Sequence, residues 1–136
     1  MAESDGEYGG GRLRHKGNRG LARLRMACRN SWSGLLFAVR EESAFRQELT
    51  LTAGLIPVAL VLPFGAFERL MLIGSLVLLL VVELLNSSIE ALVDRISFEH
   101  HGLSKRAKDY GSAAVTLTLL ACAMIWGTLV CRLFLG

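Results

Sequence analysis

Three long runs of uncharged, mostly apolar residues limit what this chain can fold into more than any other feature. Residues 49–67 and 110–131 contain no charged side chain, and neither do residues 70–82. A helix that crosses the hydrocarbon core of a bilayer needs about 20 predominantly apolar residues. With 52% hydrophobic residues in a chain of 136, the sequence predicts an all-α membrane protein rather than a small soluble domain.

The first and third runs are long enough to span a membrane by themselves. We expect the first transmembrane helix at about 45–63, with a kink at Pro57 and an end near Pro63, because proline disrupts a helix. Glu68 and Arg69 are expected to form a very short polar turn. The third transmembrane helix is expected at about 110–132.

The second run is too short unless its helix also includes acidic residues. Only 13 uncharged residues precede Glu83, so a spanning helix must extend over about 70–93. A polar connection is expected over residues 94–109. Glu83 therefore lies inside the predicted helix.

The N-terminal part of the chain has a different composition. Residues 1–20 hold six glycines and charges of both signs without an apolar core, so we expect a disordered tail rather than a signal peptide. Over about 21–41, apolar residues recur every three or four positions, which predicts an amphipathic surface helix. A solvated helix packed on protein would show the same pattern. Residues 21–136 then form one membrane domain.

The basic residues are distributed unevenly along the chain. Nine Lys and Arg residues precede residue 50 and four lie within 94–109, against one in the turn and one near the C-terminus. The positive-inside rule therefore predicts a cytoplasmic N-terminus and a periplasmic C-terminus in a bacterial inner membrane. The net charge of +3 comes without a nucleic-acid-binding motif, so we expect no nucleic acid as a partner. Three unpatterned cysteines indicate neither a disulfide framework nor structural zinc.

A polar stripe at the end of the second run is the best candidate site. On a helix, five side chains fall within an arc of roughly 100°. They are Glu83, Asn86, Ser87, Glu90 and Asp94. Ionisable residues inside a membrane indicate a functional site by default.

The residue types in and around the stripe suit phosphoryl transfer. Glu83, removed from bulk water, can act as a general base on an alcohol. Glu90 can hold a divalent cation together with Glu42, and Lys108 can neutralise phosphate oxygens.

Each of these residues also has a simpler interpretation. The stripe can join helices of an oligomer by hydrogen bonds, and Glu42 with Arg46 can form an i,i+4 ion pair. His100 and His101 are expected to be solvated, and Lys108 also fits the positive-inside pattern. No P-loop or protein-kinase motif occurs, so the residues alone do not exclude that the chain is a proton- or ion-transport subunit.

Four segments closely resemble the bacterial integral-membrane diacylglycerol kinase family. They are residues 83–95 (ELLNSSIEALVDR), 103–114 (LSKRAKDYGSAA), 42–48 (ESAFRQE) and 31–35 (SWSGL). The resemblance covers about residues 21–135. It implies a homotrimer of protomers that each have a surface helix and three transmembrane helices.

The resemblance also implies roles for individual residues. Glu83 matches the general base and Asn86 lies beside it, while Glu42 and Glu90 match carboxylates that hold Mg²⁺. The positions matching nucleotide contacts are Arg23, Asn30, Glu42, Glu90, Glu99, His101, Lys108 and Asp109. The positions matching the lipid substrate are Arg23, Ser31, Trp32, Phe45, Arg46, Gln47, Glu48, Glu83 and Ser112. Asn30 and His100 stand where members of the family have tyrosine.

The implied activity is ATP- and Mg²⁺-dependent phosphorylation of diacylglycerol to phosphatidic acid at the cytoplasmic face. Related proteins of the same fold phosphorylate undecaprenol, and the stripe fits either alcohol. A non-enzymatic membrane oligomer, such as a proton-conducting subunit, would also keep buried glutamates. It would show no ATP turnover with any lipid alcohol.

Overall fold

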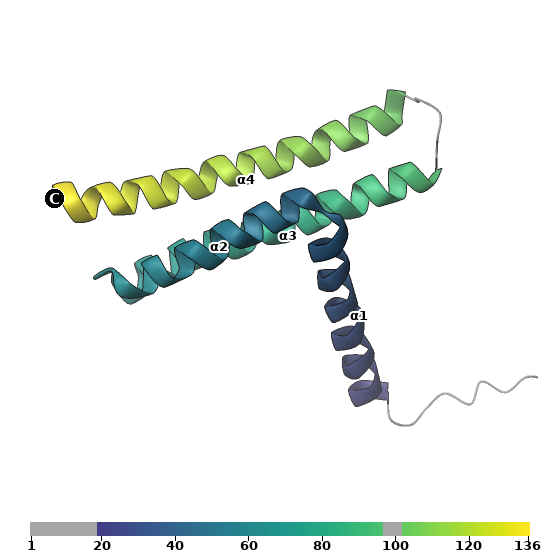
Figure 1. The fold of residues 1–136 in the computed structure, drawn as a ribbon, viewed down its shortest axis with the longest axis horizontal. Coiled ribbons are helices and arrows are strands. Elements are labelled where there is room, and N and C mark those ends of the chain that lie inside the picture. The colour runs from purple at the N-terminus through teal and green to yellow at the C-terminus, as the bar shows by residue number, and fades with distance from the viewer. Residues whose placement is uncertain (1–18, 97–101) are drawn as a thin grey trace, which may run out of the picture. The chain divides into compact units, whose positions relative to one another are not determined.

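The structure is a computed structural model that describes residues 19–96 and 102–136. Every regular element in these ranges is an α-helix, as the sequence predicts (Figure 1). The helices are α1 (Arg19–Glu41), α2 (Ser43–Val61), α3 (Ala66–Ile96) and α4 (Gly102–Leu135). The predicted tail lies mostly outside the described residues, although Arg19 and Gly20 already belong to α1.

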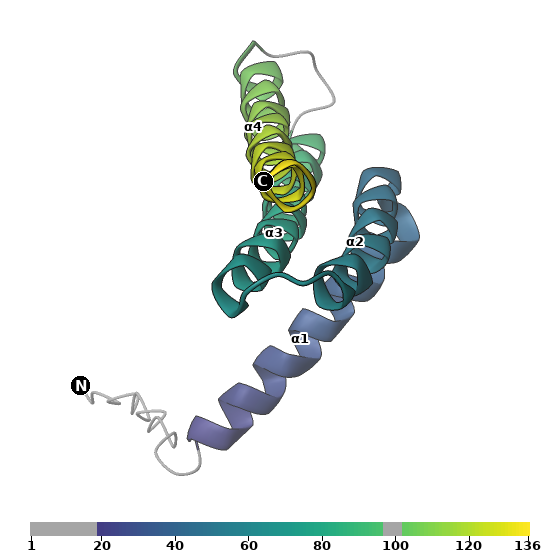
Figure 2. The ribbon, with the colours of Figure 1, turned by 90° about the vertical axis from the view of Figure 1, so that its left-hand side faces the viewer.

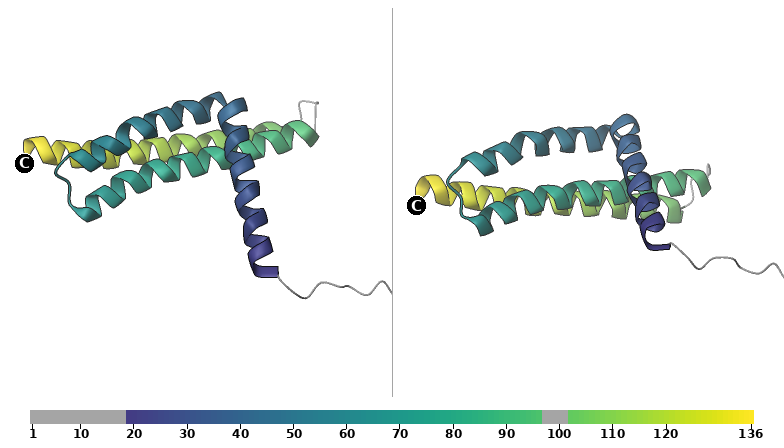
Figure 3. Two further views of the ribbon diagram at one scale, coloured as in Figure 1. Left: turned by 60° about the horizontal axis from the view of Figure 1, so that its bottom comes forward. Right: turned by 90° about the horizontal axis from the view of Figure 1, so that it is seen from below.

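The chain divides into two units, one ending at Ser33 and the other comprising residues 34–136. The described part of the first unit is the N-terminal portion of α1, a helix with exposed apolar side chains such as Leu21 and Trp32. In the second unit, α3 contacts both α2 and α4 (Figure 2). Helices α3 and α4 run side by side along most of their length (Figure 3).

The turns between helices differ from the expected positions. The helix α2 continues through Pro57 and ends at Val61, before Pro63. The chain then reverses over residues 62–65, and Glu68 lies in the first turn of α3 instead of in the connection. There the Glu68 carboxylate accepts a hydrogen bond from the Gly65 N–H at 2.8 Å, which satisfies a backbone donor at the helix start.

The expected polar connection over 94–109 is also largely helical. Asp94 belongs to the last turn of α3, and residues 102–109 form the first two turns of α4. Charged side chains do not end a helix by themselves, because Lys, Arg and Glu have high helix propensity. Lys105, Lys108 and Asp109 are therefore presented from a helix rather than from a loop.

Helices α3 and α4 are each long and apolar enough to cross a membrane. The helix α2 is shorter, at 19 residues, and carries Arg46 and Glu48 near its start, so its role as a third span remains a prediction. Much of the apolar surface of α4 is exposed, including Leu117 and Met124. Water disfavours such a continuous apolar surface, whereas lipid or neighbouring helices can cover it.

The α3–α4 pair has two halves that we name by their residues. The apolar half comprises residues 66–80 and 118–135, and the polar half comprises residues 81–96 and 102–117. The core lies in the apolar half, where the Trp126 indole N–H donates to the Leu72 carbonyl at 3.3 Å.

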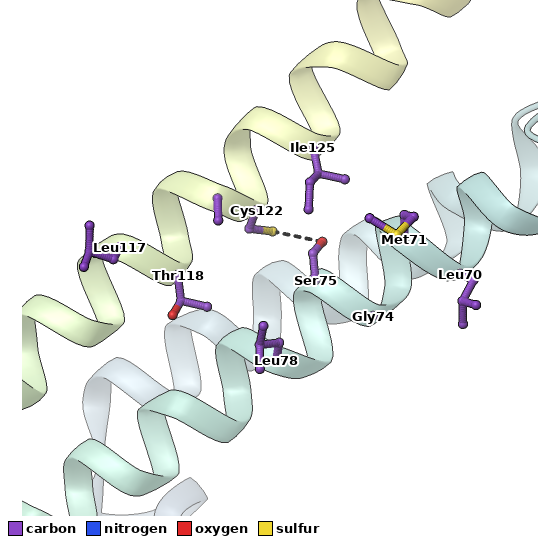
Figure 4. A pocket seen from close by; sticks show the side chains of 10 residues that line it. Leu70, Met71, Gly74, Ser75, Leu78, Leu117, Thr118, Cys122 and Ile125 are labelled. Atoms are coloured by element: carbon purple, nitrogen blue, oxygen red, sulfur yellow. Dashed lines mark hydrogen bonds between the residues drawn. The ribbon is translucent and has the colours of Figure 1, made fainter.

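An apolar groove of about 400 Å³ lies along the same part of the helix pair (Figure 4). Ser75 and Cys122 hydrogen-bond across it at 3.4 Å. Leu78 and Leu117 also line the groove, and none of the candidate catalytic residues does. The groove is therefore separate from the candidate site.

Candidate functional site

The candidate site continues the buried face of α3. Leu72, Leu76 and Leu79 are fully buried at spacings of four and three residues, and Glu83 follows four residues later on the same face. Asn86 and Glu90 extend that face by two more turns and are half-buried. The predicted polar stripe is thus the continuation of the core stripe.

Glu83 is the one buried carboxylate in the part of the chain that the structure describes, with 3% of its surface exposed. Three other carboxylates lie within electrostatic range of it, namely those of Glu42, Glu48 and Glu90. Burying a charged group costs free energy unless it is paired, and ionisable groups kept inside a membrane usually have a function. The charges of both predicted metal ligands, Glu42 and Glu90, therefore act on the predicted base.

Asn86 occupies the contact between α3 and α4. Its side-chain amide donates to the Glu90 carboxylate at 3.3 Å. Its Oδ1 atom is buried and has no hydrogen-bond partner among the described residues. A Cβ atom on Gly111 of α4 would lie 2.2 Å from that oxygen, so only glycine fits there without displacing Asn86.

Two ion pairs lie in the first turns of α4. Lys108 pairs with Asp94 of α3 at 2.6 Å, and Lys105 pairs with Asp109 one turn along the same helix at 2.6 Å. Lys108 precedes the apolar run of α4. The hydrogen bond from its ammonium to Asp94 raises the pKa of Lys108, so the side chain stays protonated.

Glu42 lies at the N-terminus of α2, where its side chain makes no capping hydrogen bond. Its carboxylate is half-buried. No group of three or more His, Cys, Asp or Glu side chains forms a preformed metal cage within residues 19–96 and 102–136. Mg²⁺ needs no such cage, because it usually takes one or two carboxylates together with substrate phosphates.

The residues expected to contact lipid have different environments. Phe45 is buried in the core, Glu48 is half-buried, and Gln47 and Ser112 are exposed. Arg46 donates to the carbonyls of Val39 and Arg40 at 3.3 and 2.9 Å. It therefore satisfies carbonyl groups at the end of α1, as basic residues often do at helix C-termini.

Several predicted contact residues are not brought to the cluster by the described structure. Glu99, His100 and His101 lie outside the described residues. The others belong to the first unit and are exposed on α1: Arg23, Asn30, Ser31 and Trp32. Their roles remain predictions.

Sequence reasoning missed three features of the site. It assigned Glu48 to lipid contact and did not anticipate that the charges of Glu48 and Glu83 act on each other. It gave no role to Gly111, although a glycine directly before Ser112 and two alanines indicates close helix packing. It did not pair Asp94 with Lys108, because the two are separated by a segment whose path the sequence does not reveal.

Comparisons with known proteins agree on one family. Residues 29–130 match the family described as prokaryotic diacylglycerol kinase. The diacylglycerol kinase of Pseudomonas aeruginosa is 49% identical over 115 residues, which cover 85% of this chain and 94% of that protein. The enzyme of Escherichia coli K12 is 45% identical over 107 residues, which cover 79% of this chain and 88% of that protein. A diacylglycerol kinase of Helicobacter pylori is 43% identical over 117 residues, covering 86% and 91%.

Proposed function

This chain belongs to the prokaryotic diacylglycerol kinase family, and from that premise we propose that the cluster around Glu83 transfers the γ-phosphoryl group of ATP to the sn-3 hydroxyl of diacylglycerol. The family makes the chain a lipid kinase. The proposal assigns the chemistry to particular side chains. Direct in-line transfer to give phosphatidic acid requires a base on the hydroxyl and neutralisation of phosphate charge.

The observation that carries the proposal is the burial of Glu83 among other carboxylates. Its side chain is 3% exposed on a helix that can span a membrane. A base placed at this depth can meet a lipid hydroxyl that does not leave the bilayer. Glu83 takes the hydroxyl proton as the oxygen attacks phosphorus, and Asn86 beside it offers an unpaired carbonyl oxygen that can accept a hydrogen bond from a substrate.

Glu42 and Glu90 are the proposed ligands of Mg²⁺. When bound, the ion would neutralise phosphate charge and orient the triphosphate. The Asn86 amide donates to one Glu90 oxygen and thereby orients that carboxylate. Glu42 is available because its side chain is not used to cap α2.

The phosphate side of the site is proposed to consist of Lys108 and Asp109 on the first turns of α4. The Lys108 ammonium provides three N–H donors and a permanent charge for phosphate oxygens. We assign the remaining nucleotide contacts to residues at matching family positions: Arg23, Asn30, Glu99 and His101.

A homotrimer in the bacterial inner membrane is part of the proposal. One helix pair with an attached α2 is too thin to enclose ATP and a lipid together, and sites shared between protomers would solve this. The exposed apolar side chains of α4 are consistent with lipid and protomer contacts. The uneven distribution of Lys and Arg supports a cytoplasmic N-terminus, a periplasmic C-terminus and a site at the cytoplasmic face.

The testing experiment measures ADP release by the purified full-length protein in lipid-containing micelles with Mg-ATP. Diacylglycerol, undecaprenol and no added lipid are compared. We expect release that depends on diacylglycerol. A preference for undecaprenol would keep the mechanism and change the substrate, and no release with either alcohol from a well-folded oligomer would overturn the proposal.

A further inference from the structure

The ion pair between Asp94 and Lys108 connects α3 to α4 within the polar half. The Lys108 ammonium lies 2.6 Å from the Asp94 carboxylate. The charge of Glu90, one turn before Asp94 on α3, also acts on Lys108. The ammonium is therefore hydrogen-bonded to Asp94 while the charge of a second carboxylate, that of Glu90, acts on it.

The neighbouring contacts determine which residues of α3 lie opposite Lys108. Gly111 lies one turn after Lys108 on α4 and packs directly on Asn86. Asn86 in turn donates to Glu90. Positions 86, 90 and 94 of α3 thus face positions 111 and 108 of α4 as consecutive steps of one contact.

The Asp94–Lys108 pair contributes little to stability. The two side chains are 66% and 38% exposed, so solvent screens the attraction between their charges. A second cross-helix pair, Glu68 with Arg132, already links α3 and α4 in the apolar half. The location of the Asp94–Lys108 pair, one turn from a proposed metal ligand, therefore calls for a different explanation.

We propose that Asp94 is a positioning residue that keeps the Lys108 ammonium away from Glu90. Lysine has a long, flexible side chain and three donors, so without Asp94 its strongest partner within reach is the Glu90 carboxylate. A lysine paired with Glu90 would neutralise a ligand that Mg²⁺ needs. With Asp94 present, one N–H donor is engaged there and two remain for phosphate oxygens.

This inference rests on the proposed function, because it assumes that Glu90 binds Mg²⁺ and that Lys108 contacts phosphate. It extends that function by adding a residue that has no direct contact with either substrate. It predicts a change in metal affinity that a merely structural role for Asp94 would not produce.

The experiment compares Asp94→Asn and Asp94→Glu with the unaltered protein. Binding of Mn²⁺, as a stand-in for Mg²⁺, is measured by the free-Mn²⁺ electron paramagnetic resonance signal in the presence of a non-hydrolysable ATP analogue. Mg²⁺ dependence of ADP release is measured in parallel. We expect Asp94→Asn to raise both half-saturating metal concentrations about three- to tenfold, with a smaller change in kcat. Asp94→Glu, which keeps the carboxylate, should have half-saturating metal concentrations close to those of the unaltered protein.

Glu68→Gln is the matched control, because it removes a carboxylate from the other cross-helix ion pair of the same two helices. Its metal dependence should equal that of the unaltered protein. The decisive test is a double-mutant cycle in which Asp94→Asn is also made in the Lys108→Met variant. There, Asp94→Asn should have no further effect on Mn²⁺ binding, because the ammonium that Asp94 restrains is gone.

The outcomes separate the two proposals. If Lys108→Met impairs ATP use but Asp94→Asn leaves metal binding unchanged, the positioning role is wrong and the proposed function stands. The same holds if Asp94→Asn weakens metal binding equally with and without Lys108. If Lys108→Met has no effect on the kinetics with ATP, the assignment of Lys108 to the phosphate side fails.

Discussion

The two halves of the α3–α4 pair use the same helix face for different purposes. In the apolar half, Ser75 donates to the Leu72 carbonyl at 2.8 Å and Trp126 donates to the same carbonyl, so these buried polar groups are satisfied. In the polar half, the oxygens Asn86 Oδ1 and Ser87 Oγ are buried without a partner among the described residues. The apolar half has one such atom, Arg69 Nε, but the same guanidinium donates through Nη2 to the Leu62 carbonyl. Buried polar groups that a fold leaves unpaired indicate a place for ligands or water.

This difference separates stability from activity along one pair of helices. Close packing and mostly satisfied hydrogen bonds hold the apolar half together. The polar half contains carboxylates and unpaired acceptors of the proposed site. Substitutions in the apolar half should therefore change stability at nearly constant specific activity. Substitutions in the polar half should change specific activity at nearly constant stability.

The largest expected effect comes from Glu83→Gln, which removes the proposed base and keeps the size and hydrogen-bonding capacity of the side chain. The kcat for ADP release should fall by about 10²- to 10⁴-fold, the usual contribution of a general base, while the thermal unfolding midpoint is retained. Ser75→Ala, two turns earlier on the same face, is the control and should retain its kcat. Full turnover by Glu83→Gln would exclude the base assignment.

The second largest effect should be on stability. Leu76 is fully buried between α3 and its neighbours, and Leu76→Ala should lower the free energy of unfolding by about 2 kcal/mol or more through the cavity it leaves. Unfolding in denaturing detergent measures this, and ADP release is normalised to folded protein. The KM for ATP should be unchanged; a raised KM would show that the two halves are coupled.

A smaller effect is expected where α4 approaches Asn86. Gly111→Ala introduces a Cβ atom at 2.2 Å from Asn86 Oδ1, so the amide must move away from Glu90. We expect kcat/KM for ATP to fall about tenfold. Gly127→Ala on the same helix is the matched control, because nothing lies within 4 Å of the added atom. Equal kinetics for the two variants would contradict the role of this contact.

The smallest effect should follow from Arg132→Gln in the apolar half. This removes the ion pair with Glu68, in which the arginine side chain is 68% exposed. Exposed pairs contribute at most about 1 kcal/mol, so chemical denaturation should show a change below that value and ADP release should be unaffected. A loss of activity in Arg132→Gln would show that the ion pair in the apolar half also sets the register of α3 and α4 in the polar half.

Much of the fold was predictable because membrane helices have a strong pattern. The uncharged runs indicated helices now seen as α3 and α4, and the spacing of Glu83, Asn86 and Glu90 indicated one shared face. Helix ends were less predictable. Glu68 and Lys105 looked like parts of connections, but both belong to helices, since charged residues are compatible with helix formation.

The sequence by itself determined the helical class, the polar stripe and the identity of its carboxylates, because these follow from hydropathy and from a period of 3.6 residues. Only the tertiary structure decided which side chains of other helices meet that stripe. Glu48, Lys108 and Gly111 lie far along the chain from their partners on α3. Such contacts depend on how helices pack and in what register, which the local pattern of residues does not specify.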